Sequence, residues 1–135
     1  MQKILVGTDT SAAADLAVET AAGLARAFDA ELLVLYVKPT VDAREVFDPG
    51  KMPDPNGYLG RVQARFEGTK VRTLTETGDP AETICDIAEE EGADTIVIGN
   101  RGTHGKKRWF LGSVPNGVIQ RSPCSVFVVD TRRAQ

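Results

Sequence analysis

Hydrophobic residues along the chain form short continuous runs, separated by segments in which apolar residues recur every three or four positions. Continuous runs such as Ile4-Leu5-Val6 are typical of strands that are buried on both faces of a parallel sheet. They predict strands over residues 3–8, 31–37 and 95–98. Alternating β-branched residues predict another strand over 71–77, at a sheet edge, and a last strand is predicted over 125–130.

Helix signals lie between these runs. Apolar residues at three- and four-residue spacing predict a first helix that Thr10 or Ser11 can cap and that continues to about Ala27. Asp79 as a cap and Pro80 at the first helical position predict the start of another helix, and Gly92 its end.

Two shorter helices are also expected. One covers residues 113–121, where Pro115 is tolerated because it lies in the first turn. The other covers 58–66, after a segment from residue 38 to about 60 that is rich in proline and glycine and predicts a loop.

The alternation of strands and helices predicts an α/β domain with an open, five-stranded parallel sheet and helices on both faces. The expected strand order is 3-2-1-4-5, which reverses between the first and fourth strands. Ligands bind beyond the carboxyl ends of the strands at such a reversal. The segments 7–11 and 99–113 leave these two strands, so we expect them to meet.

Composition narrows the class of protein. The 135 residues are 41% hydrophobic, which suits one domain over residues 1–135. A net charge of −3 and a pI near 5.2 argue against nucleic-acid and membrane-surface partners. The chain begins with a short strand-like run, so we expect no secretory signal and a cytoplasmic location. Cys85 and Cys124 lie far apart and His104 is the only histidine, so no zinc site is predicted.

A glycine-rich segment after the strand at 95–98 carries the clearest chemical signal. It reads Gly99-Asn100-Arg101-Gly102-Thr103-His104-Gly105-Lys106-Lys107-Arg108-Trp109-Phe110-Leu111-Gly112-Ser113. Glycines followed by a helix start bring backbone N–H groups and the positive end of the helix dipole together, which favours an anion. The segment is neither a Walker A loop nor a G-x-G-x-x-G fingerprint.

The spacing of Gly99, Gly102 and, nine residues later, Gly112-Ser113 resembles the G-2X-G-9X-G-S nucleotide-binding motif of the universal stress protein family. The resemblance extends from residues 3–9 to residues 122–129, almost the whole chain. It implies an adenine nucleotide as ligand, with ATP favoured and AMP or cyclic AMP as alternatives. It also implies a role as a sensor or regulator in the stress response.

Position in the predicted sheet and this resemblance together suggest a nucleotide site. Asp9 follows the first strand, where its carboxylate could bind ribose hydroxyls or approach a Mg²⁺ ion on the phosphates. The resemblance implies that the backbone near Val37 contacts the base. The predicted nucleotide-binding residues are Thr8, Asp9, Val37, Gly99, Asn100, Arg101, Gly102, Gly112, Ser113 and Val114.

Structural roles remain open for some of these residues. Asp9 and Ser113 could each be a helix cap, and the glycines could serve turn geometry alone. Lys106-Lys107-Arg108 could neutralise phosphates, although at least one of them is expected to point into solvent. Trp109-Phe110-Leu111 is expected to pack beneath the loop or at a subunit contact, and His104 to be exposed.

The last strand carries the apolar run Val126-Phe127-Val128-Val129 at a predicted sheet edge, which invites pairing with another chain. The resemblance implies a homodimer joined through this strand; the alternative is an edge covered by residues 130–135.

No catalytic residue is predicted, so any hydrolysis should be slow. Two other functions stay open: a dimeric adaptor that binds no nucleotide, and an enzyme of a related adenine-binding fold, whose S-G-G-x-D-S and H-I-G-H signatures are absent.

Overall fold

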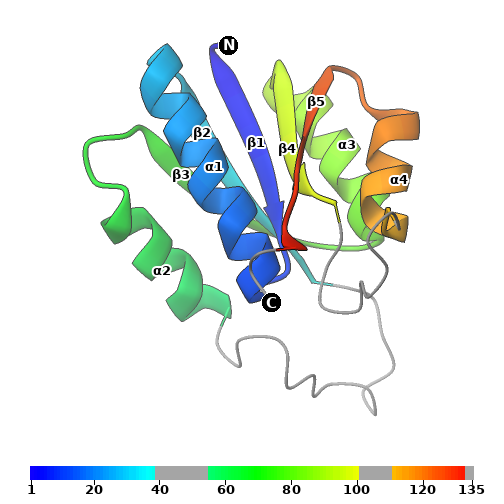
Figure 1. Ribbon diagram of the computed structural model, residues 1–135, viewed down its shortest axis with the longest axis horizontal. Coiled ribbons are helices and arrows are strands. Elements are labelled where there is room, and N and C mark those ends of the chain that lie inside the picture. Colours follow the sequence, from blue (N-terminus) through cyan, green and yellow to red (C-terminus); the bar gives the residue numbers. More distant parts are fainter. Residues whose placement is uncertain (39–54, 101–110, 133–135) are drawn as a thin grey trace.

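The computed structural model describes residues 1–38, 55–100 and 111–132. Strands and helices alternate along these ranges, in the order β1 (Lys3–Thr8), α1 (Ala12–Phe28), β2 (Glu31–Lys38), α2 (Pro55–Arg65), β3 (Val71–Thr77), α3 (Pro80–Glu91), β4 (Thr95–Gly99), α4 (Ser113–Arg121) and β5 (Ser125–Val129). The strands form one parallel sheet in the order β3-β2-β1-β4-β5 (Figure 1), which confirms the predicted fold class and places β3 and β5 at the edges.

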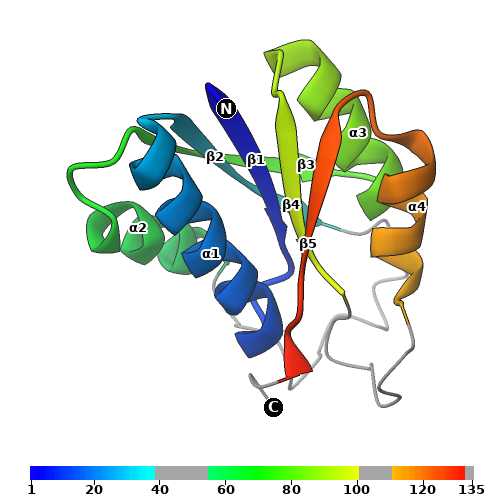
Figure 2. The ribbon, with the colours of Figure 1, turned by 45° about the horizontal axis from the view of Figure 1, so that its top comes forward.

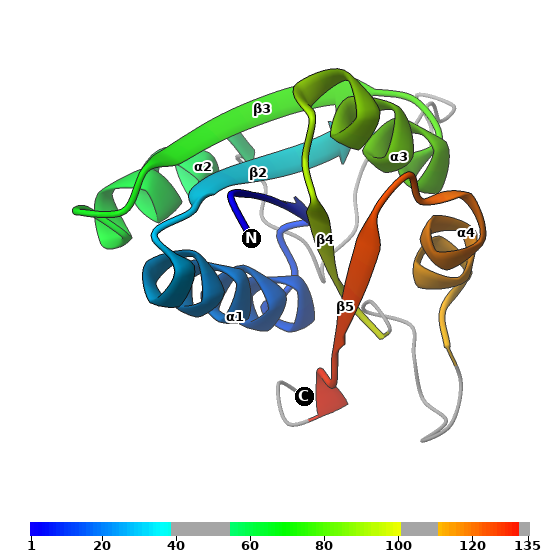
Figure 3. The same ribbon diagram turned by 90° about the horizontal axis from the view of Figure 1, so that it is seen from above.

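Two layers of helices cover the sheet, α1 and α2 on one face and α3 and α4 on the other (Figures 2 and 3). Successive residues of a strand point to opposite faces, so the continuous apolar run of β1 serves both cores. Ile4 and Val6 pack with α1 and α2, whereas Leu5 packs with α3 and α4, and all three are fully buried.

The predicted signals at the helix ends are confirmed for α1 and α3. The Ser11 hydroxyl accepts a hydrogen bond from the N–H of Ala14 at 3.1 Å and caps α1. The Asp79 carboxylate accepts from the N–H of Glu82 at 3.0 Å, and Gly92 ends α3 with a left-handed φ of 68°. These ends satisfy backbone groups that an α-helix cannot pair internally.

The helix predicted over residues 58–66 is confirmed as α2, but its predicted start was wrong. The helix begins at Pro55, three residues earlier, within the segment predicted to be a loop. Proline is suited to a first helical position. Burial of Tyr58, Leu59 and Val62 against the first core outweighs the low helix propensity of the nearby glycines. The remainder of the predicted loop, 39–54, lies outside the described residues.

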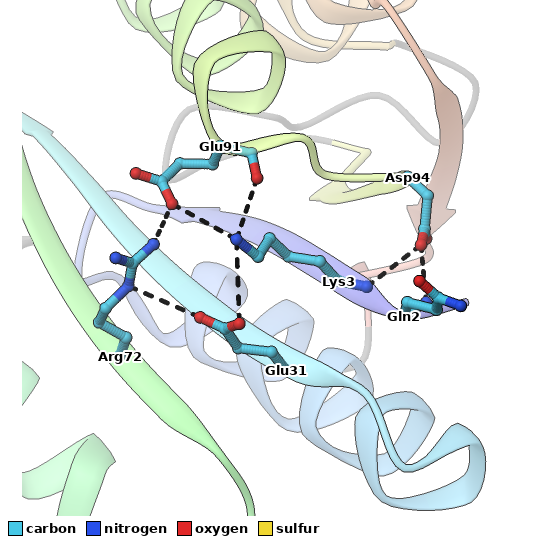
Figure 4. A network of polar contacts seen from close by, with 6 residues as sticks. All are labelled: Gln2, Lys3, Glu31, Arg72, Glu91 and Asp94. Carbon is cyan, nitrogen blue, oxygen red and sulfur yellow. Dashed lines mark hydrogen bonds and ion pairs between the residues drawn. The ribbon is translucent and has the colours of Figure 1, made fainter.

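Ion pairs close the edge of the sheet at which the strands begin (Figure 4). The Lys3 ammonium donates to the Glu91 carbonyl at 2.9 Å and lies 3.8 Å from the Glu31 carboxylate. Arg72 pairs with both Glu31 and Glu91, and Asp94 accepts from the Lys3 backbone N–H at 3.1 Å. The charged groups of this edge therefore bind one another. Within the described ranges, no helix is long and apolar enough to cross a bilayer.

Candidate functional site

The opposite edge of the sheet contains the reversal in strand order. β1 and β4 are neighbours, with a register that runs from Ile4 opposite Thr95 to Val6 opposite Val97. Beyond this register β1 continues into the β1–α1 loop and β4 into Gly99. The segments that follow β1 and β4 run to opposite faces of the sheet, because α1 and α4 lie on different sides of it. This is the place at which open α/β sheets bind ligands.

The β1–α1 loop presents the predicted residues Thr8 and Asp9. Thr8 is buried, and its hydroxyl accepts a hydrogen bond from the Thr10 N–H at 3.0 Å. Asp9 is partly exposed, and its Oδ1 accepts from the Ser11 N–H at 2.9 Å. Because Ser11 is the residue that caps α1, the interpretation of Asp9 as the helix cap is wrong. The Asp9 carboxylate instead lies in the loop that follows β1.

Thr10 is a feature of this loop that the sequence did not reveal. It is buried and has a φ of 69°, in the left-handed region that β-branched residues rarely adopt. Sequence patterns identify such positions when glycine or asparagine occupies them, and threonine carries no such signal. Strained backbone of this kind costs about 1–3 kcal/mol and is concentrated at functional sites.

The end of β2 lies beside the β1–α1 loop. β1 ends with Thr8 opposite Tyr36, whereas Val37 and the residue after it continue the pairing with β3 alone. The Val37 side chain is buried in the second core, and Val37 lies one residue beyond the last pair that β2 makes with β1. Partial burial, and then the nearby Asp9 carboxylate, raise the pKa of the Tyr36 phenol.

Asn100 joins the two described ends of the glycine-rich loop. Its backbone N–H donates to the Val129 carbonyl at 2.9 Å, and its carbonyl accepts from the Gly112 N–H, also at 2.9 Å. Its side-chain Oδ1 accepts from the backbone N–H and the hydroxyl of Thr131, at 3.1 and 2.9 Å. Asn100 therefore brings Gly99 and Gly112 together, while its side-chain oxygen binds the segment after β5.

The middle of the loop, residues 101–110, lies outside the described residues. The predicted contacts of Arg101 and Gly102 fall there, as do the expectations for His104, for the basic run at 106–108 and for the aromatic pair at 109–110. The last residue of the predicted apolar group, Leu111, is described and partly buried. Its carbonyl accepts a weak hydrogen bond from the Asn116 side chain at 3.4 Å.

Helix α4 begins without a side-chain cap. Gly112 is its N-cap residue, and Ser113 is the first helical residue, so the interpretation of Ser113 as the cap is wrong. Pro115 has no N–H, which leaves Ser113 and Val114 as the backbone donors that follow Gly112 in the first turn. The side chain of Ser113 is exposed, and Val114 is partly buried against the second core. An uncapped helix start of this kind suits an anion.

Taken together, the described residues place a carboxylate, strained backbone and an uncapped helix start at one end of the sheet. Backbone N–H groups at a helix start can bind phosphate oxygens, and a carboxylate can accept hydrogen bonds from ribose hydroxyls. In the described part of the chain, no three histidine, cysteine or acidic side chains come together as a metal site.

Comparison with known proteins gives consistent matches over nearly the whole chain. A sequence model of the universal stress protein family matches residues 1–130. A universal stress protein of Methanocaldococcus jannaschii is 33% identical, over 95% of this chain and 81% of the relative. Universal stress protein YxiE of Bacillus subtilis is 30% identical, over 94% of this chain and 97% of the relative.

Solved structures agree with these matches. A universal stress protein in complex with cAMP superposes with a TM-score of 0.74 at 30% identity, covering 96% of this chain and 97% of the other. The universal stress protein UspA from Lactobacillus plantarum superposes with a TM-score of 0.82 at 27% identity, covering 95% and 97%. The order of elements and the sheet topology described above are therefore shared with solved members of one family.

Proposed function

Because the chain belongs to the universal stress protein family, we propose that it binds an adenine nucleotide, with ATP favoured, and acts as a sensor or regulator in the stress response. The observation that carries the proposal is the hydrogen bond from the Gly112 N–H to the Asn100 carbonyl. It sets the uncapped start of α4 beside Gly99, where the strand order reverses. The cAMP complex of a relative with 30% identity supports a ligand of this class.

Each part of the nucleotide has a proposed partner. Phosphate oxygens would accept hydrogen bonds from the Ser113 and Val114 N–H groups, with the helix dipole contributing. The Asp9 carboxylate would accept from ribose hydroxyls, and the Val37 backbone would contact adenine. Arg101 and Gly102 remain predicted contacts of the same loop.

A magnesium ion would arrive with the nucleotide. Mg²⁺ is commonly held by one or two carboxylates together with substrate phosphates. Asp9 is partly exposed, and one of its oxygens accepts from the Ser11 N–H. This environment fits a carboxylate that meets a phosphate-bound ion, with most of the coordination supplied by phosphates and water.

Two substitutions at Gly112 test the anion site. Its φ of −61° and ψ of 165° are open to any L-residue, so Gly112→Asp and Gly112→Asn both introduce a good cap. They have nearly the same shape and differ in charge. Calorimetric titration with ATP, AMP and cyclic AMP, with and without Mg²⁺, should show ATP affinity about a hundredfold lower in Gly112→Asp, because a carboxylate would then face the phosphates.

The neutral variant is the control for shape. The ATP affinity of Gly112→Asn should fall by about tenfold or less, because the asparagine side chain competes for the same N–H groups but does not repel the phosphates. The free energy of unfolding of both variants should equal that of the wild type or exceed it by a few tenths of a kcal/mol. Equal losses in the two variants would contradict phosphate binding at α4. A folded wild-type protein that binds none of the three nucleotides would leave the dimeric adaptor as the better account.

We also propose that two copies associate through β5. Phe127 and Val128 are 41% and 39% exposed on this edge strand, and exposed apolar edges pair with other chains. Sedimentation velocity should show a dimer that Val128→Lys converts to monomer. Phe28→Lys is the matched control, because Phe28 is also exposed but lies at the end of α1. A monomeric wild-type protein would contradict the proposal.

A further inference from the structure

The pairing of β4 with β5 changes where the glycine-rich loop begins. In a parallel ladder, a residue whose N–H donates to one residue of the neighbouring strand accepts, with its carbonyl, from the residue two positions further along that strand. The Asn100 N–H donates to the Val129 carbonyl at 2.9 Å. A regular ladder would therefore continue with the Thr131 N–H donating to the Asn100 carbonyl. Here the Asn100 side chain takes the place of that carbonyl, because its Oδ1 accepts from the Thr131 N–H at 3.1 Å.

This replacement leaves the Asn100 carbonyl for the start of α4, where it accepts from the Gly112 N–H at 2.9 Å. β5 lies beside β4 within the sheet, whereas α4 covers one face of the sheet (Figure 3). A carbonyl that points toward α4 is turned away from β5, so the last donor of the ladder needs another acceptor. The side-chain oxygen of an asparagine can supply one.

Burial holds the Asn100 side chain in this arrangement. Thr131 is fully buried, and its hydroxyl donates to the same Oδ1 at 2.9 Å. The two donors of Thr131 therefore use both lone pairs of this oxygen. Buried donors are costly to leave unpaired, which opposes any rotation of the side chain. Gly99, the last residue of β4, has no side chain with which to fix the end of the strand.

We infer that Asn100 is a positioning residue for the anion site: its side chain replaces its own carbonyl in the sheet, so that this carbonyl holds Gly112 and the backbone donors at the start of α4 in place. The helix continues directly from this contact, since the Gly112 carbonyl accepts from the Asn116 N–H at 3.1 Å. The Asn100 side-chain oxygen is thus assigned to Thr131 and not to a ligand. The nucleotide rests on the proposed function; the replacement of the acceptor does not.

NMR of the nucleotide-free wild-type protein can identify the acceptors. Scalar couplings across hydrogen bonds join the amide nitrogen of the donor to the carbonyl carbon of the acceptor. We expect one coupling from the Thr131 nitrogen to the side-chain carbonyl carbon of Asn100, and another from the Gly112 nitrogen to the backbone carbonyl carbon of Asn100. A coupling from the Thr131 nitrogen to that backbone carbon would overturn the inference. This measurement depends on no variant that has to fold.

Asn100→Ala tests what the side chain does for the site. Without Oδ1, the Thr131 N–H competes with the Gly112 N–H for one carbonyl, so hydrogen exchange of the Gly112 amide in the nucleotide-free protein should be about five- to tenfold faster. Calorimetry should show a dissociation constant for ATP about three- to tenfold higher, because donors that are no longer held have to be ordered when the phosphates bind. Asn100→Asp keeps the oxygen and should return Gly112 exchange to within about twofold of the wild type.

Thr95→Val is the matched control for a loss of stability alone. Thr95 is buried at the other end of β4, and its hydroxyl donates to the Asp94 carboxylate at 3.0 Å. This variant should be destabilised, yet it should keep Gly112 exchange and ATP affinity within about twofold of the wild type. Equal changes in Asn100→Ala and Thr95→Val would make lost stability the cause and would overturn the inference.

Two further outcomes of Asn100→Ala are decisive. Lower ATP affinity with an unchanged Gly112 exchange rate would mean that the side chain contacts the nucleotide itself, which overturns the inference. Faster Gly112 exchange with unchanged ATP affinity overturns the positioning role for the ligand. A wild-type protein that binds no nucleotide contradicts the proposed function alone, and the couplings and Gly112 exchange then decide whether Asn100 holds the start of α4.

Discussion

Helices α3 and α4 pack against each other on one face of the sheet, yet they begin in opposite ways. At the start of α3, the carboxylate of Asp79 accepts the N–H of Glu82, and Pro80 occupies the first helical position. At the start of α4, Gly112 has no side chain to offer, and its own N–H binds the Asn100 carbonyl at the end of β4.

Under the proposed function, the difference separates a helix start that is capped within the chain from one whose backbone donors are left for a ligand. A start that is capped by its own side chain is stabilised locally and has fewer backbone donors left for a ligand. A start built on glycine depends on distant residues for its position and keeps donors for an anion. We therefore expect loss of the cap of α3 to change stability alone, and a charge placed at the start of α4 to change nucleotide affinity.

The largest effect on stability is expected from Asn100, which positions the start of α4 from a distance. Asn100→Ala removes the acceptor for the N–H and hydroxyl of Thr131, which is fully buried. Lost acceptors for buried donors cost about 1–3 kcal/mol each, so the unfolding free energy should fall by about 2–3 kcal/mol in urea denaturation. Asn56→Ala, on the exposed side of α2, should change it by less than about 0.5 kcal/mol. A loss below about 1 kcal/mol in Asn100→Ala would mean that another group replaces this acceptor.

A smaller effect is expected where the two helices touch. A Cβ added at Gly117 of α4 would lie 2.7 Å from the Cβ of Ala81 in the first turn of α3. Gly117→Ala should therefore destabilise by about 1–2 kcal/mol despite its better helix propensity, because the helices must separate. The same substitution at Gly23 of α1 meets no atom within 4 Å and should stabilise by about 0.5–1 kcal/mol. Thermal unfolding measures the change in stability of each variant. A change in the same direction in both would contradict the close packing of α4 against α3.

The smallest effect on stability should come from the cap of α3. Asp79→Ala should lower the unfolding free energy by about 1 kcal/mol and leave ATP affinity within about twofold of the wild type. This is the reverse of the result expected for Gly112→Asp, in which stability is kept and affinity is lost. Denaturation and calorimetry on the same samples measure both quantities, and a clear loss of ATP affinity in Asp79→Ala would remove the distinction between the two helix starts.

Several elements were correctly predicted because their signals are local. The continuous apolar runs of β1, β2 and β4 indicate burial on both faces, and the alternation of strands with helices indicates that the strands are parallel. The start of α3 is encoded by adjacent residues. Helix α2 was harder to predict, because its glycines argue against a helix while its buried residues Tyr58, Leu59 and Val62 act only once the core is assembled.

The sequence by itself therefore determined the fold class and the two segments that leave β1 and β4 where the strand order reverses, because apolar periodicity and glycine spacing act over short distances. Only the tertiary structure decided the left-handed conformation of Thr10, the attachment of Tyr58 to Asp15 and the use of the Asn100 side chain by Thr131. Each of these depends on which polar groups meet after the chain has folded. A partner many residues away leaves no local pattern in the sequence.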